Sequence, residues 1–105
     1  MNIKDTLTER ASTHGSFLVN SFLSQSLKGI VHNSPNGHLL PSDQKEALDM
    51  IMHKVSRILA GDNNYIDTWR DIAGYAQLVV DSLYTNPAAT DCEVIKKKIK
   101  VDLPF

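Results

Sequence analysis

The sequence predicts an all-α fold: a small antiparallel bundle of three to four helices with a C-terminal arm. Two breaks rich in Gly, Pro and Asn, at 33–37 and 61–64, divide the chain. In the segments that the breaks separate, apolar residues recur at helical spacing. At 105 residues, the chain is expected to be a single helical domain, 1–105, with its core at 16–84.

Composition excludes several classes of protein. With 42% hydrophobic and 22% charged residues, the chain has ordinary globular usage. Its net charge of −1 gives no basic field, so neither DNA nor RNA is expected as a partner. No apolar run approaches the roughly 18 residues of a membrane span, so no membrane partner is expected. A lone cysteine, Cys92, excludes an internal disulfide.

The N-terminus lacks the apolar region of a secretory signal, which indicates a cytoplasmic protein. So short a chain buries a modest core, and we expect it to form a homo-oligomer. The first long helix is predicted at about 16–31, after a shorter polar segment at 3–12. Its buried stripe is predicted to contain Leu18, Phe22, Leu27, Ile30 and Val31, with Leu23 beside it.

The second helix has the clearest boundaries. Ser42 is predicted as its N-cap, Asp43 favours the helix dipole in the first turn, and Gly61 is predicted to end it. Its apolar stripe is Leu48, Ile51, Met52, Val55, Ile58 and Leu59.

A third helix is predicted at about 67–84. Its buried face is predicted to consist of Trp69, Ile72, Ala76, Val79, Val80 and Leu83. Gly74 costs this helix about 1 kcal/mol relative to Ala, which close packing or a ligand would explain. The arm at 92–105 mixes β-branched residues with lysines, and its apolar end at 103–105 suggests docking, for example onto a second subunit.

Four charged residues are the centre of the candidate site. Lys54 and Arg57 share one side of the second helix, and Asp67 and Asp71 lie four residues apart on the third. A short loop joins these helices, so they should pack antiparallel and bring the four together. The cluster can be an interhelical ion-pair network, or it can be a phosphate or nucleotide site.

Three further residues complete the predicted ligand-binding set. His14 precedes Gly15-Ser16, where a helix start can present free N–H groups to an anion. Arg10 could close over a phosphate, and Tyr75 shares the face of Asp71 and could stack on a base. The predicted ligand-binding residues are therefore Arg10, His14, Lys54, Arg57, Asp67, Asp71 and Tyr75, with no catalytic residue and no metal ligand assigned.

A hydrolytic alternative uses a different set of side chains. Glu46, Asp49, Asp67 and Asp71 could hold Mg²⁺ for attack on a phosphoanhydride. Glu46 and Asp49 can equally be solvated charges near a helix N-terminus, where acidic residues favour the dipole. The leading hypothesis needs no cofactor, whereas the hydrolase needs Mg²⁺.

Three stretches resemble a family of small helical proteins encoded by bacteriophages and prophages, of unknown function. Residues 9–17 resemble an E-R-x-x-x-[YH]-G-x-F opening, and residues 43–59 a D-Q-x-E-A-L-x-M-I-x-H-K-x-x-R-I-L helix. Residues 67–76 resemble D-x-W-x-D-I-A-G-Y-A. The resemblance covers about residues 9–83 and implies a location in the cytoplasm of the bacterial host.

The chain is also faintly similar to the all-helical nucleoside triphosphate pyrophosphohydrolases of the MazG type. Those enzymes hold Mg²⁺ with an E-x-x-E helix and an E-x-x-D helix. Here the matching stretches are 46–49 and 67–71, and both depart from the pattern, the second in spacing too.

The function expected from these observations is nucleotide binding without catalysis. Phages encode small oligomeric helical proteins that sequester cyclic-nucleotide or ADP-ribose-type signals of bacterial immunity, and this chain is similar to that class in size and predicted helicity. The first alternative is a Mg²⁺-dependent pyrophosphohydrolase. The second is a structural or protein-interaction module.

Overall fold

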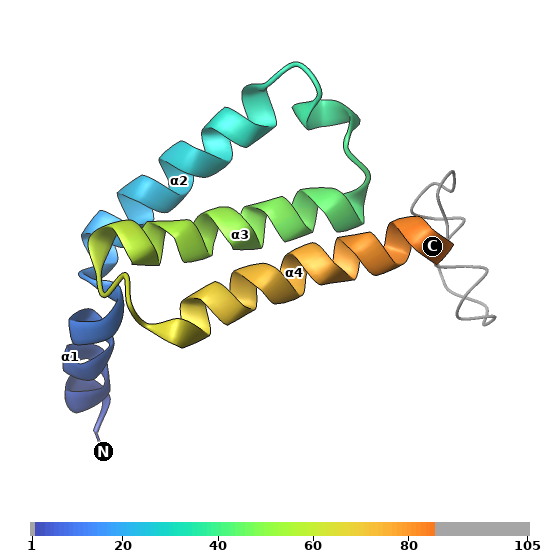
Figure 1. Ribbon diagram of the computed structural model, residues 1–105. Helices are drawn as coiled ribbons and strands as arrows, with labels where there is room; N and C mark the ends of the chain where they lie inside the picture. Colours follow the sequence, from blue (N-terminus) through green and yellow to red (C-terminus); the bar gives the residue numbers. More distant parts are fainter. Residues whose placement is uncertain (1, 86–105) are drawn as a thin grey trace, which may run out of the picture.

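Helices make up most of the part of the chain that the computed structural model describes, residues 2–85. They are α1 (Ile3–His14), α2 (Phe17–Asn33), the short 3-10 helix η1 (Gly37–Leu39), α3 (Ser42–Ala60) and α4 (Ile66–Thr85) (Figure 1). Residues 2–85 contain no strand, so the prediction of an all-α fold is confirmed. The predicted arm at 92–105 and Cys92 lie outside the described residues.

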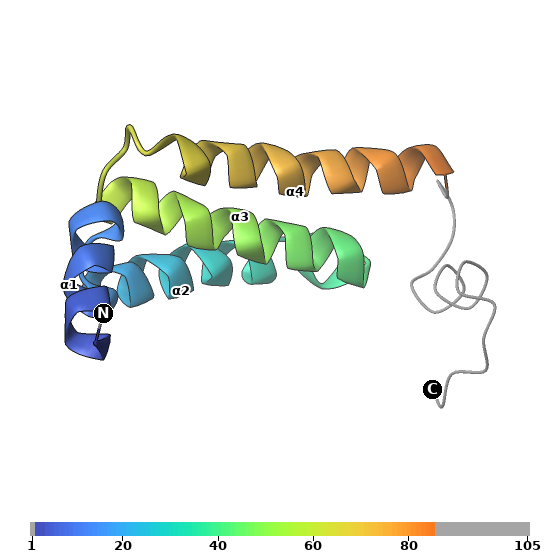
Figure 2. The same ribbon diagram turned by 90° about the horizontal axis from the view of Figure 1, so that it is seen from below.

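Helix α3 is the centre of the arrangement. Helices α2 and α4 run along opposite sides of α3, and α1 meets α3 near its C-terminal end (Figures 1 and 2). Contacts with α2 come from Asp49, His53 and Ser56, whereas Asp43 and Lys54 contact α4. The three long helices therefore form a layer with two open faces.

Local sequence signals set most helix ends. The Asn2 side chain accepts a hydrogen bond from the N–H of Asp5, and the Ser16 side chain accepts one from Val19, so each residue caps a helix. The prediction of Ser42 as an N-cap is wrong by one position. Pro41 occupies the cap and Ser42 is the first helical residue, which fits the tolerance of a helix start for a residue without an N–H.

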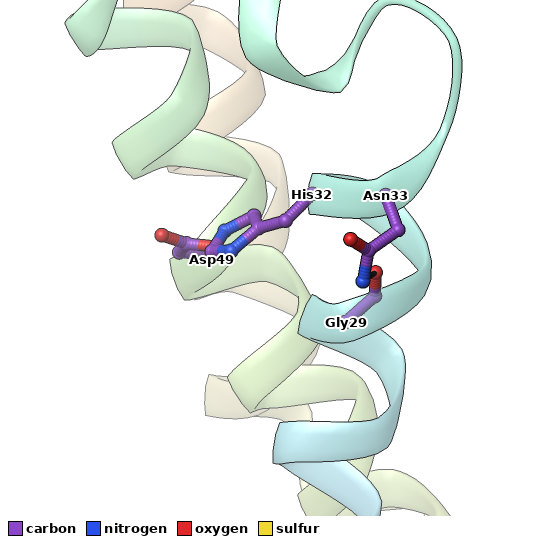
Figure 3. Close-up of polar contacts among 4 residues, drawn as sticks. All are labelled: Gly29, His32, Asn33 and Asp49. Atoms are coloured by element: carbon purple, nitrogen blue, oxygen red, sulfur yellow. Dashed lines mark hydrogen bonds and ion pairs between the residues drawn. The ribbon is translucent and has the colours of Figure 1, made fainter.

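The first two helices are longer than predicted. Helix α1 runs to His14 rather than Ser12, and α2 runs to Asn33 rather than Val31. Both predictions stopped at a polar stretch, where side-chain hydroxyls and amides compete with the helix for backbone groups. In the structure, the amide of Asn33 donates to the carbonyl of Gly29 instead, at 2.8 Å (Figure 3).

Two glycines join the α1–α2 turn to the end of α3. Gly15 has φ +84°, and a Cβ there would lie 2.7 Å from the carbonyl carbon of Ala60. A Cβ at Gly61 would lie 2.6 Å from the Cα of His14. The N–H of Asp62 donates to the carbonyl of Thr13 at 2.8 Å. Backbone therefore packs directly on backbone here, which only glycine permits.

The interior of the layer is mostly polar. Among residues 2–85, the buried side chains other than Ala47, which is 7% exposed, are those of Asn20, Ser24, Ser56 and Thr68. Ser56 donates to the carbonyl of His53 at 2.6 Å and lies 3.3 Å from the Asn20 amide oxygen. Hydrogen bonds between small polar groups therefore hold α2 against α3, since buried polar groups need partners.

The apolar stripes consequently do not lie where the sequence predicted. On α2, Leu18, Phe22 and Ile30 are exposed; Phe22 is 73% exposed. On α4, Trp69 is 51% exposed, although it was expected in the core. The predictions of burial that the structure contradicts concern Leu18, Phe22, Ile30, Leu59, Trp69, Ala76, Val80 and Leu83.

Except for Leu18 and Phe22, which lie farther round α2, the displaced residues share one side of the layer. At about 100° per residue, the stripe of each antiparallel helix points to the same side of α3, away from the cross-helix pairs Lys54–Asp71 and Asp43–Ser82. We call this side the apolar face and the opposite side the polar face. The apolar face consists of Val19, Leu23, Ile30, Leu48, Met52, Val55, Leu59, Trp69, Ala73, Ala76, Val80 and Leu83.

Two further findings concern single elements. Nothing lies within 4 Å of a Cβ built on Gly74, so the close neighbour expected there is not present among the described residues. None of the helices within residues 2–85 is both long enough and apolar enough to cross a membrane.

Candidate ligand-binding site

A pocket of about 370 Å³ lies on the polar face, where the end of α1, the end of α3 and the start of α4 meet. We call it the corner pocket. Its volume is within the range of small-molecule sites. It is lined by His14, Arg57, Tyr65, Asp67, Thr68, Arg70 and Asp71.

Backbone contacts between the two helical corners position the pocket. His14 is the last residue of α1, and the glycine contacts described above hold it against the loop after α3. The ring of Tyr65, just before α4, stacks on the ring of His14 with centroids 5.6 Å apart and an interplanar angle of 29°. Two aromatic rings from distant parts of the sequence thus form one wall.

His14 has an unused polar atom in this wall. Its Nδ1 is buried and has no hydrogen-bond partner within the described part of the chain. Burial, and after it the charges of Arg57, Lys54 and Arg10, lowers the pKa of His14 from its ordinary value of 6.5. The ring is therefore neutral at pH 7, and a ligand atom could satisfy Nδ1.

The four charged residues of the predicted cluster come together but play different parts. Lys54, only 13% exposed at its side chain, pairs with Asp71 at 2.9 Å. Asp67 lies 3.9 Å from Arg70, one turn along the same helix. Arg57 forms no ion pair and no side-chain hydrogen bond with any described residue. The network interpretation therefore fits Lys54 and Asp71, and Arg57 remains available to an anion.

Acidic groups shape the side of the pocket near Tyr65. The charge of Asp67 and its hydrogen bond with the Tyr65 hydroxyl raise the pKa of that hydroxyl above its usual value of 10.0. Three cations, Arg57, Arg70 and Lys54, face the two carboxylates Asp67 and Asp71. One positive charge is therefore left in excess.

The structure brings most of the predicted ligand-binding residues together. His14, Arg57, Asp67 and Asp71 line the corner pocket, and Lys54 reaches it through Asp71. Two residues do not line it. Arg10 is exposed on α1 and acts on the site only through its charge on His14. Tyr75 is half-buried along the α3–α4 contact, two turns beyond Asp67.

Sequence reasoning missed three of the lining residues. Tyr65 precedes the apolar stripe of its helix, so periodicity gave no reason to select it. Thr68 and Arg70 lie between the residues selected from the third helix, and neither belongs to its apolar stripe or to its acidic pair. The position of Tyr65 could have indicated its place in the pocket. It directly follows the short loop at 61–64, and a residue there lies beside the end of the preceding helix.

The four carboxylates of the hydrolase alternative do not meet. Asp49 contacts α2, where its Oδ1 lies 2.6 Å from Nε2 of His32 (Figure 3), and Asp67 and Asp71 lie on the α4 side of α3. Glu46 is exposed nearer the start of α3. Within residues 2–85, no three His, Cys, Asp or Glu side chains are grouped so as to hold a metal ion. These residues therefore do not fit a shared Mg²⁺ site.

Of the backbone N–H groups of the predicted anion site at 15–16, that of Gly15 already has a partner within the chain. The N–H of Gly15 donates to the carbonyl of Ala11 at 2.9 Å, closing α1. Ser16 uses its side chain as the cap of α2. The Gly15 N–H is therefore engaged, and the groups that we expect a ligand to contact are the side chains lining the corner pocket.

Comparison with known proteins adds no relative. No protein-family model matches the chain, and no curated protein and no solved structure is significantly similar to it. The geometry of the corner pocket is therefore the main guide to function: it offers one unpaired guanidinium, one neutral imidazole, one aromatic ring and two carboxylates.

Proposed function

We propose that the chain is a nucleotide-binding protein that holds its ligand in the corner pocket without catalysis. The observation that carries the proposal is the unpaired Arg57 beside the buried, unpartnered Nδ1 of His14. Arg57 supplies a planar, permanently charged group for phosphate oxygens. His14 supplies a neutral hydrogen-bonding group at the same wall, and the Tyr65 ring gives an apolar surface beside both.

The charge of the pocket favours one kind of phosphate. An excess of one positive charge balances a phosphodiester or one end of a pyrophosphate, but it leaves most of a triphosphate's charge unanswered. Asp67 can accept hydrogen bonds from ribose hydroxyls. These features support cyclic nucleotides and ADP-ribose-type molecules as the ligand class over nucleoside triphosphates.

The biological role we propose is the sequestration of such a signal during phage infection. That part of the proposal rests on the resemblance of residues 9–83 to phage-encoded proteins. Binding without turnover is supported by the separation of Glu46 and Asp49 from Asp67 and Asp71, because the four carboxylates are not grouped so as to share one metal ion within residues 2–85.

The test is calorimetric titration of the full chain with cyclic dinucleotides, ADP-ribose and ATP. We expect binding by at least one of the first two, weaker binding of ATP, and recovery of intact ligand by chromatography. Arg57→Gln should lower the affinity at least tenfold, because a charge-assisted phosphate contact is lost. It should fold normally, since Arg57 has no described partner to leave unpaired.

The matched control is Lys45→Gln, which removes an exposed cation from the same helix away from the pocket and should leave affinity unchanged. Absence of heat with every probe would contradict the proposal and favour a protein-interaction module. Release of pyrophosphate in Mg²⁺ would contradict it in the other direction, toward a hydrolase.

A further inference from the structure

The apolar face is too large to be left in water. Single exposed apolar residues are normal, but contiguous patches beyond a few hundred Å² mark an interaction surface. Here every long helix contributes. Ile30 on α2, Leu59 on α3 and Trp69 on α4 are each more than half exposed on the same side of the layer.

The interior of one chain cannot make up for this exposure. Ala47 is the single apolar side chain that is nearly completely buried among residues 2–85, so the layer has little hydrophobic core of its own. Burial of apolar area is the dominant favourable term in folding. Whatever covers the apolar face therefore completes the core.

From these observations, we propose that a second copy of this chain covers the apolar face, giving a homodimer of two helix layers packed face to face. Helices of 17, 19 and 20 residues are about 25–30 Å long. Three of them with axes 8–10 Å apart present a face on the order of 750 Å². A stable interface buries about 800 Å² per partner, so one copy of the face matches another in size.

The pattern on α4 also suits packing against another helix. Ile66, Trp69, Ala73, Ala76 and Val80 follow alternating spacings of three and four residues, which is the repeat of helices that pack side by side. All five residues are exposed, whereas Thr68 on the neighbouring side of α4 is buried.

The C-terminal 20 residues of the chain, 86–105, are the competing occupant. If they packed on the face as one helix about 30 Å long and 10 Å wide, they would cover on the order of 300 Å², less than half of the face. They also carry four lysines between 96 and 100, which an apolar face does not accommodate. A second copy is the occupant that the area favours.

Face-to-face packing has a consequence for the corner pocket. The pocket opens on the polar face, so a dimer built through the apolar face leaves both pockets on its outer surfaces. Dimerisation goes beyond the proposed function and does not depend on it, because no residue of the pocket belongs to the interface.

The first test is light scattering after size exclusion on the full chain, with a mass of twice 11.7 kDa expected. In addition, the melting temperature should rise with protein concentration, because association stabilises only the folded chain. A mass of 11.7 kDa and a melting temperature independent of concentration would overturn the proposal, and would favour the C-terminal segment as the cover.

A pair of variants on α4 localises the interface. Val80→Asp places a charge on the apolar face and should halve the mass or unfold the chain. Leu78→Asp places the same charge on the other side of α4, where Leu78 is already 64% exposed, and should keep the mass of the dimer. An unchanged mass in a folded Val80→Asp would show that the apolar face is not the interface.

Discussion

Outside the corner pocket, several side chains on the polar face pair across neighbouring helices. Lys54 pairs with Asp71, Ser82 donates to Asp43 at 2.9 Å, and the two corners are joined by backbone contacts. On the apolar face, by contrast, Trp69 and Ile30 are largely exposed within one chain. The polar face is therefore specified by contacts inside the chain, whereas residues 2–85 leave the apolar face partly uncovered.

The two faces differ in what their contacts contribute: those of the polar face orient the helices, and burial of the apolar face would add stability. In a closed bundle, the same interior would do both. Hydrogen bonds and ion pairs add little net stability each, but they fix how the helices lie against one another. Apolar burial supplies stability without directional preference. The pocket lies on the side where geometry is fixed by directional contacts, which suits a site that must present several groups to one ligand.

The largest effect is expected where the α1–α2 turn packs on the loop after α3, because this backbone contact positions the corner pocket on the polar face. In Gly61→Ala, the new Cβ would lie 2.5 Å from the carbonyl oxygen of Thr13 and 2.6 Å from the Cα of His14. Backbone cannot yield as a side-chain tip can, so we expect a loss of about 3 kcal/mol in the free energy of unfolding. Chemical denaturation measures this loss.

The same variant should also weaken ligand binding in the fraction that remains folded, since the corner positions His14 and Tyr65. A stability within about 0.5 kcal/mol of the parent chain would show that the α1–α2 turn does not pack on Gly61. The contact that we expect to position His14 and Tyr65 in the corner pocket would then be absent.

The second prediction concerns the polar interior. Asn20→Leu removes an amide that donates to the carbonyls of His14 and Ser16 and leaves the hydroxyl of Ser56 without its α2 partner. The Ser56 hydroxyl keeps the His53 carbonyl, but the carbonyl of His14 loses its amide donor, and the lost hydrogen bonds together should cost about 1–3 kcal/mol in the free energy of unfolding. Asn33→Leu is the matched control on the same helix, because Asn33 is exposed and bonds only to Gly29; it should cost less than about 0.5 kcal/mol. Equal costs would mean that the α2–α3 contact is not specified by its polar groups.

Sequence patterns predicted the helices well and their orientation poorly. Periodicity located α2, α3 and α4 to within a few residues, because helix formation depends on local spacing, caps and breaks. The same reasoning put Trp69 and Phe22 in the core, because it assumed that the apolar stripe faces the nearest helix. Here polar residues such as Ser56 occupy that contact, and the stripe points elsewhere.

The charged residues of the candidate site could be predicted from the sequence, but its aromatic wall could not. Lys54, Arg57, Asp67 and Asp71 could be brought together from an antiparallel helix pair alone. Tyr65 could not be selected, because its place depends on how one corner stacks on another. Tertiary packing of loops carries no periodic signal in the sequence.

The third prediction tests whether His14 contacts the phosphate of the ligand. A bound phosphodiester should raise the pKa of His14, which is lowered by burial and by nearby cations in the free protein. The complex then binds a proton more readily than the free chain, so affinity should increase as the pH falls from about 7.5 to 5.5. A pKa difference of one unit corresponds to about a tenfold change.

Calorimetry with a cyclic dinucleotide measures this dependence, because a phosphodiester does not titrate in that range. His14→Gln should abolish most of the dependence, whereas His38→Gln, at an exposed position in η1, should retain it. An affinity that does not change with pH in the parent chain would place the phosphate away from His14.

The smallest expected effect tests the outer surface of α4. Nothing lies within 4 Å of a Cβ built on Gly74, which stands in the middle of the helix without a positive φ. Gly74→Ala should therefore raise the free energy of unfolding by about 0.5–1 kcal/mol, because alanine loses less backbone entropy. The sign is opposite to that of Gly61→Ala, although both exchange glycine for alanine. A destabilisation measured at Gly74 would instead mean that another molecule packs against that turn, on a side of α4 that the face-to-face dimer leaves open.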